Sequence, residues 1–178
     1  MALVGGAMPV EARFLLMSES QQPGSESAFV RLHVARAALV DIDAARVALT
    51  DVAWLGRTSD GPADQPEVRR IAADLELPIL DGSAATPVRK AALIDLGPPQ
   101  VRDGGLTVTV AWQSATYAPL FPVFFGELRV ARGGLNLDGR YVPPFGRIGL
   151  LIDAALLHFV ARRTAQAFLT RIAARVSS

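Results

Sequence analysis

The sequence contains no cysteine, only two histidines and almost no excess charge. Without cysteine, the chain forms no disulfide and offers no thiolate to a substrate or a metal ion. A net charge of +1, with 20% charged residues, supplies no electrostatic field that would hold a nucleic-acid backbone. We therefore expect no nucleic-acid partner. The lack of cysteine permits a reducing compartment, and a cytoplasmic location is expected.

Long apolar runs are also missing. No run reaches the roughly 20 residues that a membrane-spanning helix needs, because Asp153, His158 and two arginines interrupt the most hydrophobic segment. No basic region precedes the mildly apolar N-terminus, so neither a signal peptide nor an integral membrane span is expected. Since His33 and His158 are the only imidazoles, a three-histidine metal site is excluded, and we expect neither metal nor cofactor.

The first half of the chain contains signals for a strand and two helices. Residues 29–40 have the branched-residue content of a strand, although their alanine-rich second half also suits a helix. Asp41 is a suitable cap for a helix over residues 44–52. Pro66 is well placed to begin a second helix, in which apolar residues recur every three or four positions until Pro78 ends it.

The second half of the chain alternates apolar and polar residues in a way that predicts strands. Strands are expected over residues 88–96, 106–115, 120–131 and 135–142, with the last two joined by a tight turn at Gly133-Gly134. After Pro143-Pro144, apolar residues with helical spacing predict one long helix over residues 147–176. Small alanines occupy the middle of its apolar stripe, which allows close packing or leaves space beneath the helix.

Residues 41–51 and 135–146, together with the long helix that follows, resemble the START-like, Bet v 1-like helix-grip superfamily, which includes polyketide cyclase and dehydrase-type proteins. The resemblance implies an α+β helix-grip fold, in which a curved antiparallel sheet wraps around a long C-terminal helix. It would cover residues 28–176, after an N-terminal segment, 1–27, that is partly flexible or adds a strand. It also implies a cavity between sheet and helix that holds a small hydrophobic ligand, such as a lipid or a polyketide-like molecule.

Aromatic residues on the predicted strands are candidates for the wall of such a cavity. The full set of predicted ligand-binding residues is Trp112, Phe124, Leu128, Tyr141, Ala154, Leu157, His158 and Ala161. An aromatic stripe is also what an ordinary packed core contains. Tyr117, Phe121 and Phe125 are assigned either to the mouth of the cavity or to the contact of a homodimer.

His158 and Tyr141 are the candidates for catalysis, because an imidazole near neutral pH and a phenol can both transfer protons. No partner for either residue is evident from the sequence, and a core histidine with a satisfied hydrogen bond explains His158 equally well. Three functions therefore remain open. They are the binding of a hydrophobic ligand, a polyketide cyclase or dehydratase-like reaction in the same cavity, and an interaction domain whose core is filled.

Overall fold

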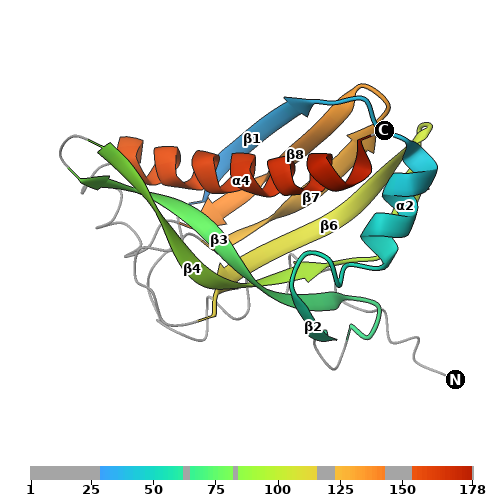
Figure 1. Ribbon diagram of the computed structural model, residues 1–178, viewed down its shortest axis with the longest axis horizontal. Helices are drawn as coiled ribbons and strands as arrows, with labels where there is room; N and C mark the ends of the chain where they lie inside the picture. The colour runs from blue at the N-terminus through green and yellow to red at the C-terminus, as the bar shows by residue number, and fades with distance from the viewer. Residues whose placement is uncertain (1–28, 62–64, 82–83, 116–122, 143–153, 178) are drawn as a thin grey trace, which may run out of the picture.

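The computed structural model describes residues 29–61, 65–81, 84–115, 123–142 and 154–177 (Figure 1). They form an α+β fold in which a large antiparallel sheet packs against a long helix near the C-terminus. The elements are β1 (Val30–Ala37), α2 (Ile42–Thr50), β2 (Arg57–Asp60), β3 (Arg69–Asp81), β4 (Ala84–Leu96), β5 (Gln100–Arg102), β6 (Gly105–Ser114), β7 (Val123–Ala131), β8 (Gly134–Val142) and α4 (Ala154–Val176).

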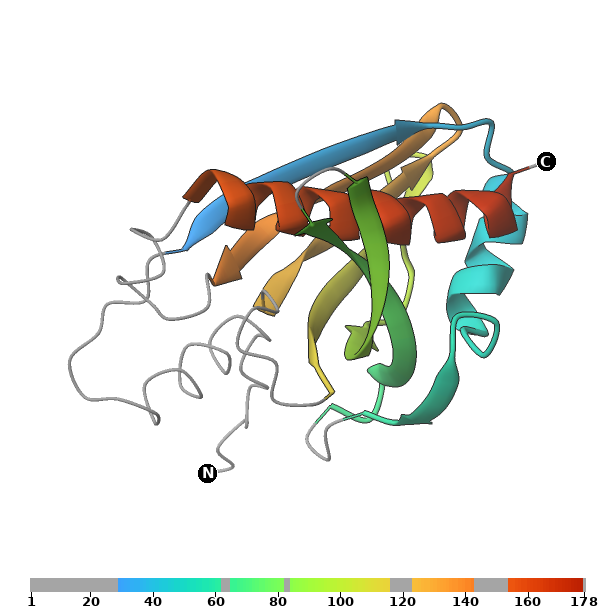
Figure 2. The ribbon, with the colours of Figure 1, turned by 60° about the vertical axis from the view of Figure 1, so that its left-hand side comes forward.

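The sheet has eight strands, seven of which follow one another in the order β1-β8-β7-β6-β4-β3-β2 while β5 pairs with β6. The first strand thus lies beside the last one, and every pairing is antiparallel. The sheet is strongly curved, and α4 lies along its concave side (Figure 2). The β3–β4 hairpin crosses next to the helix, so the helix is flanked by strands from both ends of the sheet.

The predicted first strand and the helix that follows it are confirmed. In β1, Leu32 and Val34 are buried, as the alternation of apolar residues predicts. Asp41 is the N-cap of α2, because its carboxylate accepts hydrogen bonds from the backbone N–H groups of Asp43 and Ala44. The helix begins two residues earlier than expected and ends at Thr50.

The helix predicted to begin at Pro66 is wrong, because the chain there forms strand β3. Ile71 and Ala73 are buried with the two-residue period of a strand, and residues 69–81 pair with β4 along their whole length. Pro78 lies inside β3, opposite Pro87, and does not end the element. A guanidinium–carboxylate pair between Arg70 and Asp95, with both N···O distances 2.7 Å, joins the two strands. Pairing with a distant segment therefore outweighs the local apolar spacing.

The hairpin between β7 and β8 forms where the glycine pair predicts it, shifted by one residue. Ala131 pairs with Gly134, so Arg132 and Gly133 make the turn and Gly134 already belongs to β8. Gly134 has a φ of +153°, and a Cβ there would lie 2.4 Å from the carbonyl oxygen of Arg36 in β1. This glycine lets β1 and β8 approach closely where they begin to pair.

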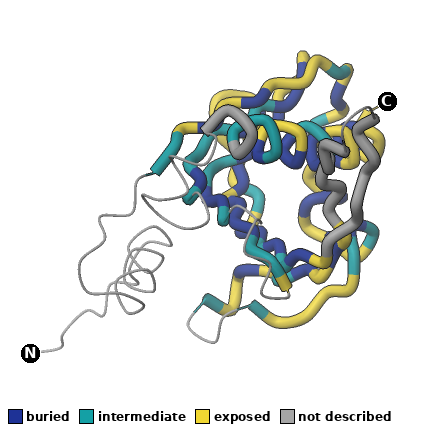
Figure 3. The backbone as a smooth tube through the Cα atoms, turned by 90° about the vertical axis from the view of Figure 1, so that its left-hand side faces the viewer, coloured by how far each residue is buried: buried dark blue, intermediate teal, exposed yellow. Residues whose placement is uncertain are grey.

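The core lies between the concave face of the sheet and α4, and Figure 3 shows buried positions on the inner side of the ring that they form. The helix is confirmed over its described part, Ala154–Val176, whereas residues 143–153 lie outside the described residues. The apolar stripe of α4 faces the sheet as expected. Its buried members include Ala161, Ala165, Phe168, Leu169, Ile172, Ala173 and Val176.

Hydrogen bonds fix the C-terminal half of α4 to both sides of the sheet. On one side, the Arg36 guanidinium of β1 donates to the Thr170 hydroxyl at 3.0 Å. On the other side, Arg171 donates to the carbonyl oxygens of Leu55 at 2.8 Å and Asp74 at 3.2 Å. Since these three contacts come from β1 on one side of the helix and from β3 and the turn before β2 on the other, they hold the helix from both sides. Within the described ranges, no helix is long and apolar enough to cross a membrane.

Candidate functional site

Three aromatic side chains form one row across neighbouring strands on the concave face. Trp112 of β6 lies opposite Phe124 of β7, which lies opposite Tyr141 of β8. The rings of Trp112 and Phe124 stack with centroids 4.1 Å apart and an interplanar angle of 19°. All three residues are at most 1% exposed. The three aromatic residues therefore lie side by side, and we call them the aromatic row; that they form the wall of a cavity stays a prediction.

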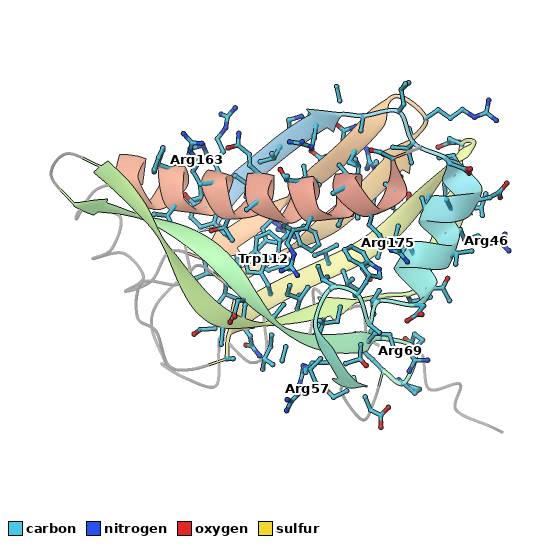
Figure 4. The ribbon with its side chains drawn as sticks, viewed as in Figure 1. Arg46, Arg57, Arg69, Trp112, Arg163 and Arg175 are labelled. Atoms are coloured by element: carbon cyan, nitrogen blue, oxygen red, sulfur yellow. The ribbon has the colours of Figure 1, made fainter. Side chains whose placement is uncertain are left out.

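Helix α4 crosses the aromatic row. His158, in the second turn of the helix, lies near Tyr141 with ring centroids 6.3 Å apart, and Phe168 lies 5.6 Å from Trp112. The residues Ala161, Thr164 and Ala165 lie between these two contact points in the helix and are fully or almost fully buried. Small side chains on the helix thus face large rings on the sheet, and Figure 4 shows Trp112 beneath the middle of α4.

The other predicted binding residues divide into two groups. Leu128 is buried on the same face as the aromatic row but further along β7, opposite Leu137 and Val108, so it belongs to the general core. Ala154 and Leu157 lie in the first turn of α4, and their side chains fall outside the described residues. The aromatic row, Ala161 and the half-buried His158 remain together as a candidate site.

Two buried polar atoms in this region have no hydrogen-bond partner in the described part of the chain: the Trp112 indole nitrogen and the Thr164 hydroxyl oxygen. Buried polar groups are normally paired, because an unpaired one costs about 1–3 kcal/mol. A helical threonine hydroxyl can donate to the backbone carbonyl three or four residues earlier. Thr50 and Thr170 do so here, each at 2.8 Å, but Thr164 does not.

No aspartate, glutamate, lysine or arginine belongs to the candidate site as the structure describes it. Besides Thr164, Thr107 is the one other polar residue classed as buried among the described side chains, and no charged residue is. Burial raises the pKa of the Tyr141 hydroxyl above its usual value, so the phenol stays protonated at neutral pH. The described residues offer hydrogen-bond donors here, and His158 adds one imidazole beside Tyr141.

Phe125 is placed on the opposite face of β7, away from the aromatic row. It is 5% exposed, packs edge-on against Phe29 at 5.6 Å and lies under the Arg140 guanidinium at 5.2 Å. Phe125 is therefore covered by its own chain. Tyr117 and Phe121, the other two residues assigned to a cavity mouth or a dimer contact, lie outside the described residues.

Metal ligands are not gathered in the described part of the chain: no group of three or more histidine, aspartate or glutamate side chains lies together there. His33 is exposed on the convex face of the sheet, where its Nδ1 bonds to the Asp138 carboxylate. Neither observation adds a catalytic group to the aromatic row.

Sequence reasoning missed Thr164 and Phe168 as members of the candidate site. Phe168 is apolar and lies within the predicted helix 147–176, where the sequence alone does not distinguish it from other core residues. Thr164 carries a weak signal, because it adds a polar group between Ala161, Ala165 and Phe168 on the buried face of the helix. Whether the Thr164 hydroxyl finds a hydrogen-bond partner depends on its side-chain rotamer and on how the helix packs on the sheet. Neither can be read from the sequence.

Comparison with known proteins identifies no family. No protein-family model matches the sequence, and no curated protein matches it. A crystal structure of a hypothetical protein from Helicobacter pylori aligns over 98% of both chains, with 11% sequence identity and a TM-score of 0.43.

Proposed function

We propose that the protein is a helix-grip protein that binds one small hydrophobic molecule between the concave face of the sheet and α4. The strand order, in which β1 lies beside β8, and the helix along the concave face support this architecture. The observation that carries the proposal is the aromatic row beneath the small residues of α4. Large flat rings opposite alanines are suited to enclose an apolar molecule, because ligand sites combine apolar walls with a few polar groups.

A second candidate function is proton transfer in the same site, as in a polyketide cyclase or dehydratase-like enzyme. The proximity of the His158 and Tyr141 rings, 6.3 Å between centroids, favours it. The phenol is kept neutral by burial and the imidazole is half-buried, so both could contact one bound molecule. Loss of about a hundredfold in turnover for His158→Gln, with ligand binding unchanged, would support this function over simple binding.

The binding proposal is tested first with the purified protein. Native mass spectrometry after gentle extraction should find a retained apolar molecule. The ligand-free protein should then bind diphenylhexatriene, a neutral hydrocarbon that fluoresces in apolar surroundings, saturably and with one molecule per chain.

Two matched helix variants locate the site. Ala161→Leu adds a bulky side chain beneath α4 and should weaken binding of the hydrocarbon at least about tenfold, or about 1.4 kcal/mol. Arg162→Leu places the same side chain on the exposed face and should change affinity less than about twofold. If the wild-type protein retains no molecule and shows no saturable binding, the core is filled and the interaction-domain function replaces the proposal.

A further inference from the structure

We infer that the ligand is a neutral molecule bearing a carbonyl-type oxygen, and that this oxygen is held by the Trp112 indole N–H and the Thr164 hydroxyl. This inference rests on the proposed function and names the chemistry that the site selects. Two fully buried polar atoms, one on the sheet and one on the helix, carry it, because the described residues offer neither of them a hydrogen-bond partner.

Both groups are buried in the part of the core between β6 and the middle of α4. Trp112 contacts Phe168, which follows Thr164 by one helical turn, so indole and hydroxyl both lie near the middle of α4. Phe124 stacks on one face of the indole, and the tilted Phe168 ring is its other aromatic neighbour. Phenylalanine has no oxygen or nitrogen in its side chain, so neither ring satisfies the indole N–H.

The indole N–H and the threonine hydroxyl determine which kind of ligand atom can bind to both. An indole nitrogen only donates, and a threonine hydroxyl can donate as well as accept. A carbonyl oxygen has two lone pairs and can therefore accept from both groups. A molecule with no polar atom would leave both groups unpaired and would gain nothing from them.

The described core disfavours an anionic ligand at Trp112 and Thr164, although the half-buried imidazole of His158 lies beside Tyr141 at the other end of the aromatic row. Burying a carboxylate requires a cationic or multiple hydrogen-bonding partner, because the charged form loses its hydration. No lysine or arginine is buried among the side chains that the structure describes, and Tyr141 itself remains neutral. The expected class is thus a ketone, ester or amide on an otherwise apolar skeleton.

The test compares two probes that differ in their oxygen. The first is a propionyl-dimethylaminonaphthalene, a neutral fluorescent ketone whose emission shifts to the red when its carbonyl accepts hydrogen bonds. The second is diphenylhexatriene, which has no polar atom. Each is titrated into wild-type protein, Thr164→Val, Thr164→Ser and Trp112→Phe.

Thr164→Val keeps the side-chain shape and removes the hydroxyl, while Trp112→Phe keeps an aromatic ring and removes the N–H. Each should weaken ketone binding about three- to tenfold, the effect of one neutral hydrogen bond, and shift bound emission to the blue. Hydrocarbon affinity of Thr164→Val should stay within about twofold of wild type. Thr164→Ser, which restores the hydroxyl, should bind the ketone with wild-type affinity and emission.

The outcomes separate the inference from the function on which it rests. If wild type binds neither probe, the proposed function fails and the inference fails with it. If both probes bind but Thr164→Val and Trp112→Phe retain wild-type ketone affinity and emission, the protein binds apolar molecules without the polar contact. Equal affinity for a carboxylate analogue of the ketone would overturn the assignment of a neutral ligand.

Discussion

Replacing Thr164 by valine should stabilise the ligand-free protein. The hydroxyl is fully buried without a partner in the described structure, and such a group costs about 1–3 kcal/mol. Valine puts a methyl group in the same volume and keeps the branched shape that the helix already accommodates. Because valine and threonine have similar helix propensities, the backbone contributes little to the difference. We expect a gain of about 1–2 kcal/mol in the free energy of unfolding.

Urea unfolding followed by tryptophan fluorescence and circular dichroism measures this gain. For a chain of this size, each kcal/mol corresponds to a change of about 2–4 °C in Tm, so thermal melts should rise by about 2–8 °C. Thr170→Val is the matched control on the same helix. Its hydroxyl donates to the Gln166 carbonyl oxygen and accepts from Arg36, so its loss should leave stability unchanged or lower it.

A Thr164→Val protein less stable than wild type by about 1 kcal/mol or more would refute the reasoning, because it would show that the hydroxyl is already satisfied. The expected result is a variant that is more stable and yet binds the ketone probe less tightly. Stability and binding would then change in opposite directions, which is typical of a polar group kept for function.

Two further predictions concern the residues around the aromatic row. Gly139→Ala should destabilise the protein by about 1–3 kcal/mol in urea unfolding, because its Cβ would lie 2.5 Å from the backbone carbonyl oxygen of Phe125 in β7 and 2.6 Å from Cζ of Phe124. Gly133→Ala, where nothing lies within 4 Å, is the control, and equal costs would contradict the packing argument. Burial raises the pKa of Tyr141 above 10.0, so its contribution to stability should be complete below about pH 10 and be lost as pH rises through the folded-state pKa. Phenolate absorbance of Tyr117→Phe, in which Tyr141 is the only remaining tyrosine, measures that pKa, and titration at or below the ordinary value would contradict its burial.

The strands that carry the aromatic row could be predicted because the alternation of apolar and polar residues within each strand is a local pattern. In residues 106–112, every second residue is apolar, and the buried side of β6 follows directly from that period. The aspartate cap of α2 is equally local, since Asp41 bonds to groups two and three residues away. The sequence therefore contained the aromatic row itself, one residue from each of three strands.

The region around β3 could not be predicted in this way. Val68 and Ile71 have helical spacing, and Pro66 suits the start of a helix. What makes the segment a strand is its partner β4, which contributes Asp95 to pair with Arg70. The contact between Trp112 and Phe168 is non-local in the same sense, because it arises only when the helix is laid across the finished sheet.

The position of α4 in the chain has a consequence for folding during synthesis. The helix is synthesised after all eight strands, yet it contacts β1, β3, β8 and α2. Until the ribosome has made α4, the described elements cover only part of the concave face, where α2 packs, and leave many of its leucines, valines and aromatic rings without the helix that buries them. A nascent chain at that stage exposes a large apolar sheet, the kind of surface that chaperones recognise and that aggregates readily. Once α4 has been made, it covers this surface, and hydrogen bonds from Arg36 and Arg171 hold it there from both sides.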